Sequence, residues 1–317
     1  MTPNQQLHRP VAVDKADMVL SDLTSGGRLQ PDQLKQYIRV AIAKSVLMGM
    51  VRVTTIPTPE YNLPKMTTLG EVMKPAVSGQ ALAYAERSKV GLDYVQLVTK
   101  HGKAEVDIPR EVLEDQIERG AFKNSIMAYL GEHTSKDLEN QLINGNTATG
   151  ATAWLKLQDG LIAQTTTNTS AAGNVDLDKD VLTDLDEALP QEFDEQPGMA
   201  YFTNRFARNK HRQSISDRTG GLSDAVVDGS NKKELGWGDR VIKKIPLFPN
   251  NLGGAFNETR VLLLGPKNAI YAFYRKVTLD TEFAVRPQVY VIVLTLRSAI
   301  KYEHEPAAAM ATQVNGQ

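Results

Sequence analysis

The amino-acid sequence predicts an α+β fold, in which helices and strands follow one another without regular alternation. Apolar residues recur at helical spacing in several segments, the longest of which lies between residues 105 and 146. The run VYVIVLTLRSAI at 289–300 is rich in β-branched residues, which is typical of a buried strand. Because helical and strand-like segments do not alternate regularly, a doubly wound parallel sheet is disfavoured.

The N-terminal region is predicted to form an arm. Residues 1–31 are polar, mixed in charge and interrupted by proline and glycine, so they should have little structure of their own. They also lack the positively charged start and the apolar core of a signal peptide. A short helix is predicted next, because four apolar residues lie four positions apart: Leu34, Ile38, Ile42 and Val46.

The segment after the arm is predicted to be a long hairpin with little core of its own. Several prolines between residues 57 and 75 exclude a continuous helix. In LDYVQLVT, Leu92 and Tyr94 face one way, while Val95 and Leu97 face the other. Since an isolated hairpin is marginally stable in water, this segment should pack against another surface.

A long helix is predicted from 110 to 143, because apolar residues recur there at near-helical spacing. A helix of this length would span about 51 Å. Asp107 could cap it, and Pro109 is tolerated in a first turn. Gly120 costs about 1 kcal/mol relative to alanine and could bend the helix. Asn144 and Gly145 form a stop signal.

Shorter elements are predicted in the remaining chain. Residues 165–174, TTTNTSAAGN, have the composition of a loop, and residues 305–317 that of a small polar tail. The apolar stripe Val181, Leu182, Leu185 and Leu189 predicts a helix that ends at Pro190. A buried strand, MAYFTN at 199–204, precedes a helix at 205–217 that Thr203 or Asn204 can cap. Further apolar strand-like runs occupy 261–265, 268–274 and 289–300.

No familiar arrangement of catalytic or ligand-binding residues occurs in the sequence. The patterns GxxxxGK[ST], GxGxxG and GxSxG are absent. The chain has no cysteine, which excludes disulfides and thiolate metal sites. No two histidines lie at i,i+3 or i,i+4, so no helical metal site is predicted. We therefore predict no catalytic residue, no metal site and no cofactor, and we favour a structural protein over an enzyme.

Two groups of charged residues have alternative interpretations. Acidic residues at 184–187 and 192–195 could perform acid–base chemistry, but a solvated surface is favoured. The basic run at 205–212 falls on two faces of its predicted helix. This run could contact phosphate groups, or it could form an outer face that a neighbouring subunit neutralises, which is at least as well supported. The net charge of −1 argues against strong nucleic-acid binding by the whole protein.

The order of these segments resembles the major capsid protein of tailed bacteriophages, which has the Hong Kong 97 fold. VDIPREVLEDQ is similar to the strand that enters the long spine helix of this family. KDLENQLINGN, followed by QDGLI, resembles the end of that helix. MAYFTNRFARNKHRQSISDRTGGL resembles the helix of the axis-facing domain. The run from KKIPLFPNN through LLGPKNAIYAFYRK to VYVIVLTLRSAIKYEHEPAAA resembles the family's closing segment.

The resemblance implies five regions and the location of their contacts. The regions are an N-arm at 1–50, an E-loop at 51–104, a peripheral domain at 105–180 with its spine helix at 110–143, an axial domain at 181–285, and a peripheral closing strand with a C-terminal tail at 286–317. Gly120 would be a hinge in the spine. The residues expected to face neighbouring subunits are Lys65, Glu71, Lys74, Arg110, Glu111, Glu114, Glu118 and Arg119.

The resemblance also implies partners and a location. Copies of the chain would assemble through hexamers and pentamers into an icosahedral shell around double-stranded phage DNA, which they would contact non-specifically. Other expected partners are a separate scaffolding protein, a portal and, optionally, a decoration protein, with no membrane. The chain would be made in the host bacterial cytoplasm and end in the virion capsid. One alternative is an encapsulin-type compartment around cargo enzymes. A less favoured one is a soluble enzyme with perturbed acids or His211 in a pocket.

Overall fold

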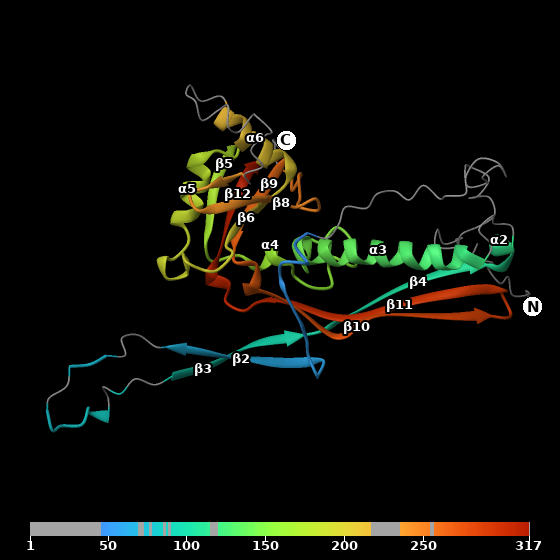
Figure 1. Cartoon of the computed structure of the whole chain (residues 1–317), viewed down its shortest axis with the longest axis horizontal. Helices are drawn as coiled ribbons and strands as arrows, with labels where there is room; N and C mark the ends of the chain where they lie inside the picture. The colour runs from blue at the N-terminus through green and yellow to red at the C-terminus, as the bar shows by residue number, and fades with distance from the viewer. Residues whose placement is uncertain are drawn as a thin grey trace, which may run out of the picture. The chain divides into compact units, whose positions relative to one another are not determined.

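A computed structural model describes most of the chain (Figure 1). The described residues are 46–68, 73–75, 78–84, 87, 90–114, 120–216, 235–253 and 257–316. The predicted arm and its helix, apart from Val46, therefore lie outside the described residues. The described chain forms two compact units, a smaller one of residues 102–134 and 277–296 and a larger one of residues 46–101, 135–276 and 297–316.

The larger unit contains a six-stranded mixed sheet. Its strand order is β5-β12-β9-β6-β8-β7. β12 runs parallel to β5 and antiparallel to β9, whereas β6 runs antiparallel to β9 and parallel to β8. The bounds are β5 (Thr169–Val175), β6 (Ala200–Thr203), β7 (Gly236–Trp237), β8 (Arg240–Lys244), β9 (Glu258–Leu264) and β12 (Ala308–Asn315).

Two strands of this sheet correct the sequence interpretation. The predicted loop at 165–174 contains most of β5, and the predicted polar tail contains β12. β12 lies inside the sheet, between β5 and β9, and its Ala308, Ala309 and Ala311 are fully buried. Small side chains give weak periodic signals, because the apolar area that they bury is small. Both segments belong to the sheet because they pair with other strands, and this pairing cannot be read from one segment alone.

Two helices complete the core of the larger unit. α5 (Lys179–Glu187) begins at Asp178, whose carboxylate accepts hydrogen bonds from the backbone N–H groups of residues 180 and 181. α6 (Arg205–Ser216) begins after Asn204, whose side chain accepts a 2.7 Å hydrogen bond from the N–H of Ala207. Both predicted helices are thus present, and Asn204 is the cap. They share one hydrophobic cluster with the sheet that includes Leu182, Leu185, Tyr201, Ala207 and Leu263.

A second sheet has the order β1-β10-β11-β4. β1 (Arg52–Thr55) runs parallel to β10 (Ala269–Ala284), with Arg52 opposite Ile270. β11 (Val289–Tyr302) contains the whole predicted strand, and β4 (Lys100–Pro109) forms the other edge. β10 extends well beyond the predicted 268–274, because its polar second half, which carries no apolar run, also pairs as a strand.

The long helical segment begins at Arg110. α2 (Arg110–Glu114) and α3 (Gly120–Asn144) are helical, and residues 115–119 lie outside the described residues. Asp107 is not the cap, because β4 continues to Pro109. Within the smaller unit, a hydrophobic cluster joins this segment to strands β4 and β11 through Ile108, Val112, Ile126, Leu130 and Ile292.

α3 ends at Asn144, as the predicted stop signal at Asn144 and Gly145 requires. A glycine is needed at position 145 because another backbone segment approaches closely there. The N–H of Gly160 donates a 2.8 Å hydrogen bond to the carbonyl oxygen of Gly145. A Cβ on Gly145 would lie 2.5 Å from the carbonyl oxygen of Gln158, so a side chain does not fit. α4 (Leu161–Gln164) begins immediately after Gly160, and its Leu161 is fully buried.

Among the described residues, short 3-10 turns connect the larger elements at η2 (Gln191–Phe193), η3 (Pro266–Asn268) and η4 (Glu305–Ala307). Among the residues that the structure describes, no helix is both long and apolar enough to cross a membrane.

Candidate assembly surfaces

The hairpin consists of β2 (Glu60–Thr68) and β3 (Val90–Val98), which pair antiparallel from Glu60 opposite Val98 to Thr68 opposite Val90. Figure 1 shows the two strands side by side. The predicted alternation is present, since Leu97 is fully buried and Val95 half-buried, while Leu92 and Tyr94 are exposed.

One face of the hairpin packs against strands β10 and β11 within the larger unit. Tyr61, Leu63, Val95 and Leu97 join a hydrophobic cluster with residues of β10 and β11, namely Ile270, Ala272, Tyr274 and Ala299, and with Ile56. The hairpin thus packs against another surface, as expected for a hairpin with little core of its own, and this surface belongs to the same chain. The strand pattern alone does not say which surface a buried face meets.

The other face of the hairpin and the connection beyond it expose large apolar side chains. Leu92 is 79% exposed and Tyr94 59% exposed. In the described part of the connection, Met73 is 81% exposed and Tyr84 76% exposed, with the guanidinium of Arg87 5.8 Å from the centroid of the Tyr84 ring. Neighbouring exposed apolar side chains, such as Leu92 and Tyr94 on one face of β3, are typical of a protein–protein contact surface.

A polar contact joins the hairpin to the segment after β11. The ammonium group of Lys65 lies within hydrogen-bonding distance of Nδ1 of His304. Burial, and then the charge of Lys65, lower the pKa of His304 below its ordinary value of 6.5. The backbone of His304 is fixed by Asn268, which donates to its carbonyl oxygen and accepts from its N–H, both at 2.8 Å. No local sequence pattern links Lys65 to His304, because the two residues are 239 positions apart in the chain.

Glu305, next to His304, holds the start of β5. Its carboxylate accepts hydrogen bonds from the N–H groups of Thr166 and Thr167, each at 2.9 Å, and from the Thr167 hydroxyl at 2.5 Å. Burial opposes its negative charge, but these hydrogen bonds outweigh burial and place the pKa of Glu305 below its ordinary value. The negative charge of this side chain therefore has a structural role.

The residues expected to face neighbours fall into two groups. Lys65 and Lys74 are half-buried on the hairpin and its connection, in the larger unit. Arg110, Glu111 and Glu114 are exposed on α2, in the smaller unit, where Nε of Arg110 lies 2.7 Å from Oε1 of Glu114. This pairing raises the pKa of Arg110. Glu71, Glu118 and Arg119 lie outside the described residues. The possible hinge, Gly120, is the first residue of α3 as described.

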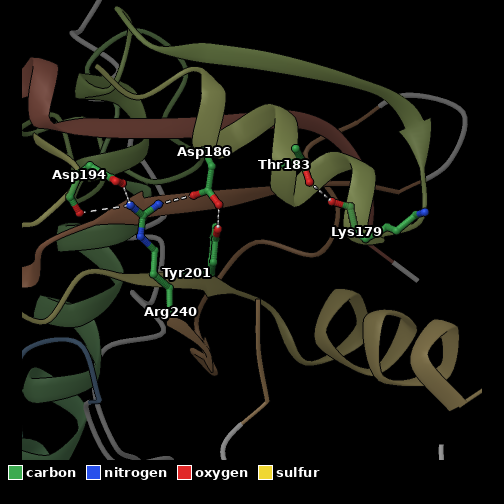
Figure 2. A network of polar contacts seen from close by, with 6 residues as sticks. All are labelled: Lys179, Thr183, Asp186, Asp194, Tyr201 and Arg240. Carbon is green, nitrogen blue, oxygen red and sulfur yellow. Dashed lines mark hydrogen bonds and ion pairs between the residues drawn. The ribbon is translucent and has the colours of Figure 1, made fainter. Parts of the chain in front are cut away.

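An arginine bridges two acidic segments that the sequence suggests are solvated (Figure 2). Arg240 forms ion pairs with Asp186 of α5 and with Asp194, which follows η2. Asp186 also accepts a 2.6 Å hydrogen bond from the hydroxyl of Tyr201. Burial, and then this bond to Asp186, raise the pKa of Tyr201 well above its ordinary value. Figure 2 shows Lys179 directed away from this network.

The network lies beside an open depression of about 960 Å³, lined by residues of α5, η2 and the β7–β8 turn. Both of its central carboxylates, those of Asp186 and Asp194, form ion pairs with Arg240. Within the described ranges, no group of three or more acidic or histidine side chains is arranged to hold a metal ion. His211, the other residue considered for an enzyme, is fully buried in α6.

Comparisons with known proteins complete these observations. No family model matches the chain. A putative prophage capsid protein, YqbE of Bacillus subtilis strain 168, is 27% identical over 304 residues, which cover 95% of this chain and 97% of that protein. Among solved structures, the capsid of a native GTA particle matches with a TM-score of 0.66 at 12% identity, over 98% of this chain and 100% of that one.

The chain has the Hong Kong 97 capsid fold. This confirms the fold class and the resemblance predicted from the sequence. The SrpI encapsulin of Synechococcus elongatus PCC 7942 also matches, with a TM-score of 0.63 at 13% identity, over 95% of this chain and 98% of that one. The fold of this chain is thus similar both to the capsid of a GTA particle and to an encapsulin.

Within this capsid fold, α6 contains the basic run at residues 205–212. Lys210 lies 3.2 Å from Asp176, and Nε of Arg208 donates a 3.2 Å hydrogen bond to the carbonyl oxygen of Ile242. Arg205 and Arg212 are exposed. The basic run falls on two faces of α6, as predicted. The three arginines, at i, i+3 and i+7, lie on one face, and Lys210 lies on the other.

Proposed function

We propose that this chain is a structural shell subunit that assembles through hexamers and pentamers into an icosahedral phage-type capsid around double-stranded DNA. The observation that carries this proposal is the capsid fold, which extends over nearly the whole chain and leaves an apolar hairpin face exposed. Such a face is unfavourable in an isolated subunit, because exposed apolar area is stabilised by burial. A neighbouring copy can bury it, and stable assembly contacts are large enough to do so.

We further propose that the regions follow the capsid family. The N-arm is then 1–50, the E-loop 51–104, the peripheral domain 105–180 with 286–317, and the axial domain 181–285. Lys65, Glu71 and Lys74 would contact a neighbour from the E-loop, and Arg110, Glu111, Glu114, Glu118 and Arg119 from the spine. The exposure of Arg110, Glu111 and Glu114 supports this assignment.

Gly120 is proposed as a spine hinge that bends while a rounded precursor shell flattens into its mature form. Glycine weakens a helix by about 1 kcal/mol relative to alanine. A Gly120→Ala variant is expected to assemble but to mature more slowly, as measured by time-resolved electron microscopy of the particles. Normal maturation of this variant would count against the hinge.

The proposed partners are a separate scaffolding protein, a portal and, optionally, a decoration protein, and the packaged DNA would be contacted non-specifically. Synthesis would take place in the cytoplasm of a host bacterium. Size-exclusion chromatography followed by electron microscopy of the purified chain tests the central proposal. Rings, tubes or closed shells are the expected result, and a stable compact monomer would refute it.

The alternative is an encapsulin-type compartment, which the similarity to SrpI supports. The two functions differ in what the shell contains. Particles purified from the natural producer should hold nuclease-protected double-stranded DNA if the chain is a viral capsid subunit. Shells that contain one co-purified enzyme and no protected DNA would favour the compartment instead.

A further inference from the structure

The open depression beside Arg240 combines apolar and acidic side chains. Its lining includes the buried side chains of Leu189 and Met199 and the half-buried ring of Trp237. Five carboxylates and two cations also line it, which leaves three negative charges in excess. Long cationic side chains suit such a surface, because their methylene groups can cover apolar area while their charged ends meet the carboxylates.

Three of the five carboxylates have no cation within the described part of the chain. The other two are those that form ion pairs with Arg240. Glu187, Glu195 and Asp239 are exposed, and their side chains form no ion pair or hydrogen bond with another described residue. Cations from outside the described residues can therefore pair with these three carboxylates.

The described chain begins next to this depression. The N–H of Leu47, a fully buried residue, donates a 2.6 Å hydrogen bond to Oε1 of Glu139 on α3. The ammonium group of Lys243, which lines the depression, lies 3.5 Å from Sδ of Met50. Both contacts lie within the larger unit. The end of the arm that joins the described chain is therefore held at the edge of the depression.

The arm segment that directly precedes this fixed point is strongly basic. Residues 34–45, LKQYIRVAIAKS, lie outside the described residues, and their sequence contains Lys35, Arg39 and Lys44 but no acidic residue. Their three positive charges equal the excess of negative charge in the lining of the depression. The segment is long enough to enter the depression from its fixed end, since a segment of this length spans about 18 Å even as a helix.

We propose that residues 34–45 dock in the depression of their own chain, where Lys35, Arg39 and Lys44 pair with its exposed carboxylates. The covalent connection favours this occupant, because a segment tethered at the edge of a site reaches an effective concentration on the order of mM there. The inference goes beyond the proposed shell function and does not depend on it, since it concerns a contact within one chain.

Other occupants fit the depression less well. Nucleic acid would be repelled by the excess of carboxylates. The same segment of a second copy carries the matching charge but lacks the tether, so it must compete with the arm of the chain itself. Isotopic or spin dilution distinguishes these two sources of the segment, because only a contact within one chain survives it.

Spin labels on the full chain measure the docking. The chain has no cysteine, so two introduced thiols are the only ones that react with the label. Ala41→Cys places one label on the arm, and Gln191→Cys places the other at an exposed, uncharged position of the lining. Pulsed electron paramagnetic resonance should give one narrow distance distribution, well below the roughly 40 Å that the extended segment spans. This distribution should persist in a large excess of unlabelled chain.

Charge reversal in the labelled chain tests the role of the carboxylates. One variant adds Lys35→Glu with Arg39→Glu, a second adds Glu187→Lys with Glu195→Lys, and a third adds all four changes. Each of the first two should lower the ratio of docked to undocked arm at least about tenfold, because like charges then meet. The fourfold variant should recover the short distance. High salt should release the arm without any reversal, because it screens exposed charges.

Lys156→Glu with Lys267→Glu is the control, because it changes the charge as much as the arm reversal does, at exposed positions outside the depression. It should keep the short distance, and thermal unfolding of every variant should match that of the parent chain. A broad distribution in the parent, or a short distance that neither reversal nor salt alters, would overturn the proposal. Loss of the short distance on dilution would assign the segment to a second copy and also overturn it. Each of these outcomes leaves the shell function standing, which only a failure to assemble refutes.

Discussion

Arg240 is the residue on which the polar network of the larger unit depends. Its side chain is only 13% exposed, and it forms ion pairs with both Asp186 and Asp194. The same residue links the end of α5 to η2 and to β8, so it fixes the loops at one side of the sheet.

Arg240→Met is expected to lower the free energy of unfolding by about 1–3 kcal/mol, because it leaves two carboxylates without their cation at a partly buried site. Tyr201→Phe, which removes only one hydrogen bond to Asp186, should cost about 1 kcal/mol. Urea unfolding measures the free energy of unfolding of both variants. If Arg240→Met lowers the free energy of unfolding no more than Tyr201→Phe does, the structural role of Arg240 is disproved.

His304 makes the stability of the hairpin base depend on pH. Its pKa is below 6.5 in the folded chain, so below that value the unfolded chain binds the proton more readily. Stability should therefore fall as the pH drops from above 6.5 towards the folded pKa. The charged groups that act on His304 are Lys65, Glu192 and Glu305, and Lys65 opposes protonation.

His304→Phe should consequently show a smaller loss of stability between pH 7.5 and pH 5.5 than the wild type. Phenylalanine keeps a ring beside Phe193, whose centroid lies 4.8 Å from that of His304. Gln96→Ala, at an exposed residue of β3 that does not titrate, is the control and should keep the wild-type slope. Equal slopes in all three proteins would show that His304 is not the sensor.

At the scale of elements, the hairpin shows two faces with different tasks. Leu97 is fully buried against residues of β10 and β11, whereas Leu92 is 79% exposed on the opposite face. The same substitution at the two positions separates folding from assembly, because only one of the side chains is packed within the subunit.

Leu97→Ala should lower the free energy of unfolding by about 2–5 kcal/mol, as expected for a buried leucine. Leu92→Ala should change it by less than about 0.5 kcal/mol, and Leu92→Ala with Tyr94→Ala should still impair assembly. Denaturation and light scattering measure the two effects. Full assembly of the double variant would contradict the role given to the exposed face.

Elements with strong periodicity could be predicted from the sequence, and elements defined by their pairing could not. The helix at α5, its end near Pro190 and the buried strand β6 follow directly from apolar spacing and from capping residues. β5 and β12 were missed because threonine, serine and alanine give little hydrophobic contrast. Their assignment as strands depends on hydrogen bonds to each other and to β9.

The candidate surfaces could be predicted only where a local sequence pattern marks them. The alternation in β3 identified its two faces, and the basic run drew attention to α6. The bridging role of Arg240 and the contact between Lys65 and His304 join positions 54 and 239 residues apart in the sequence. No local pattern reveals contacts of this range, which only the folded chain brings together.

At the scale of the whole molecule, the capsid fold extends over nearly all of the chain. We propose that a neighbouring copy covers the apolar face of the hairpin.

A cryo-electron microscopy reconstruction of the particles formed by the purified chain tests this account most directly. We predict closed shells built from five- and six-membered rings, in which Leu92 and Tyr94 are buried against an adjacent copy. A compact monomer at high protein concentration, or a shell in which both side chains remain in solvent, would contradict the account.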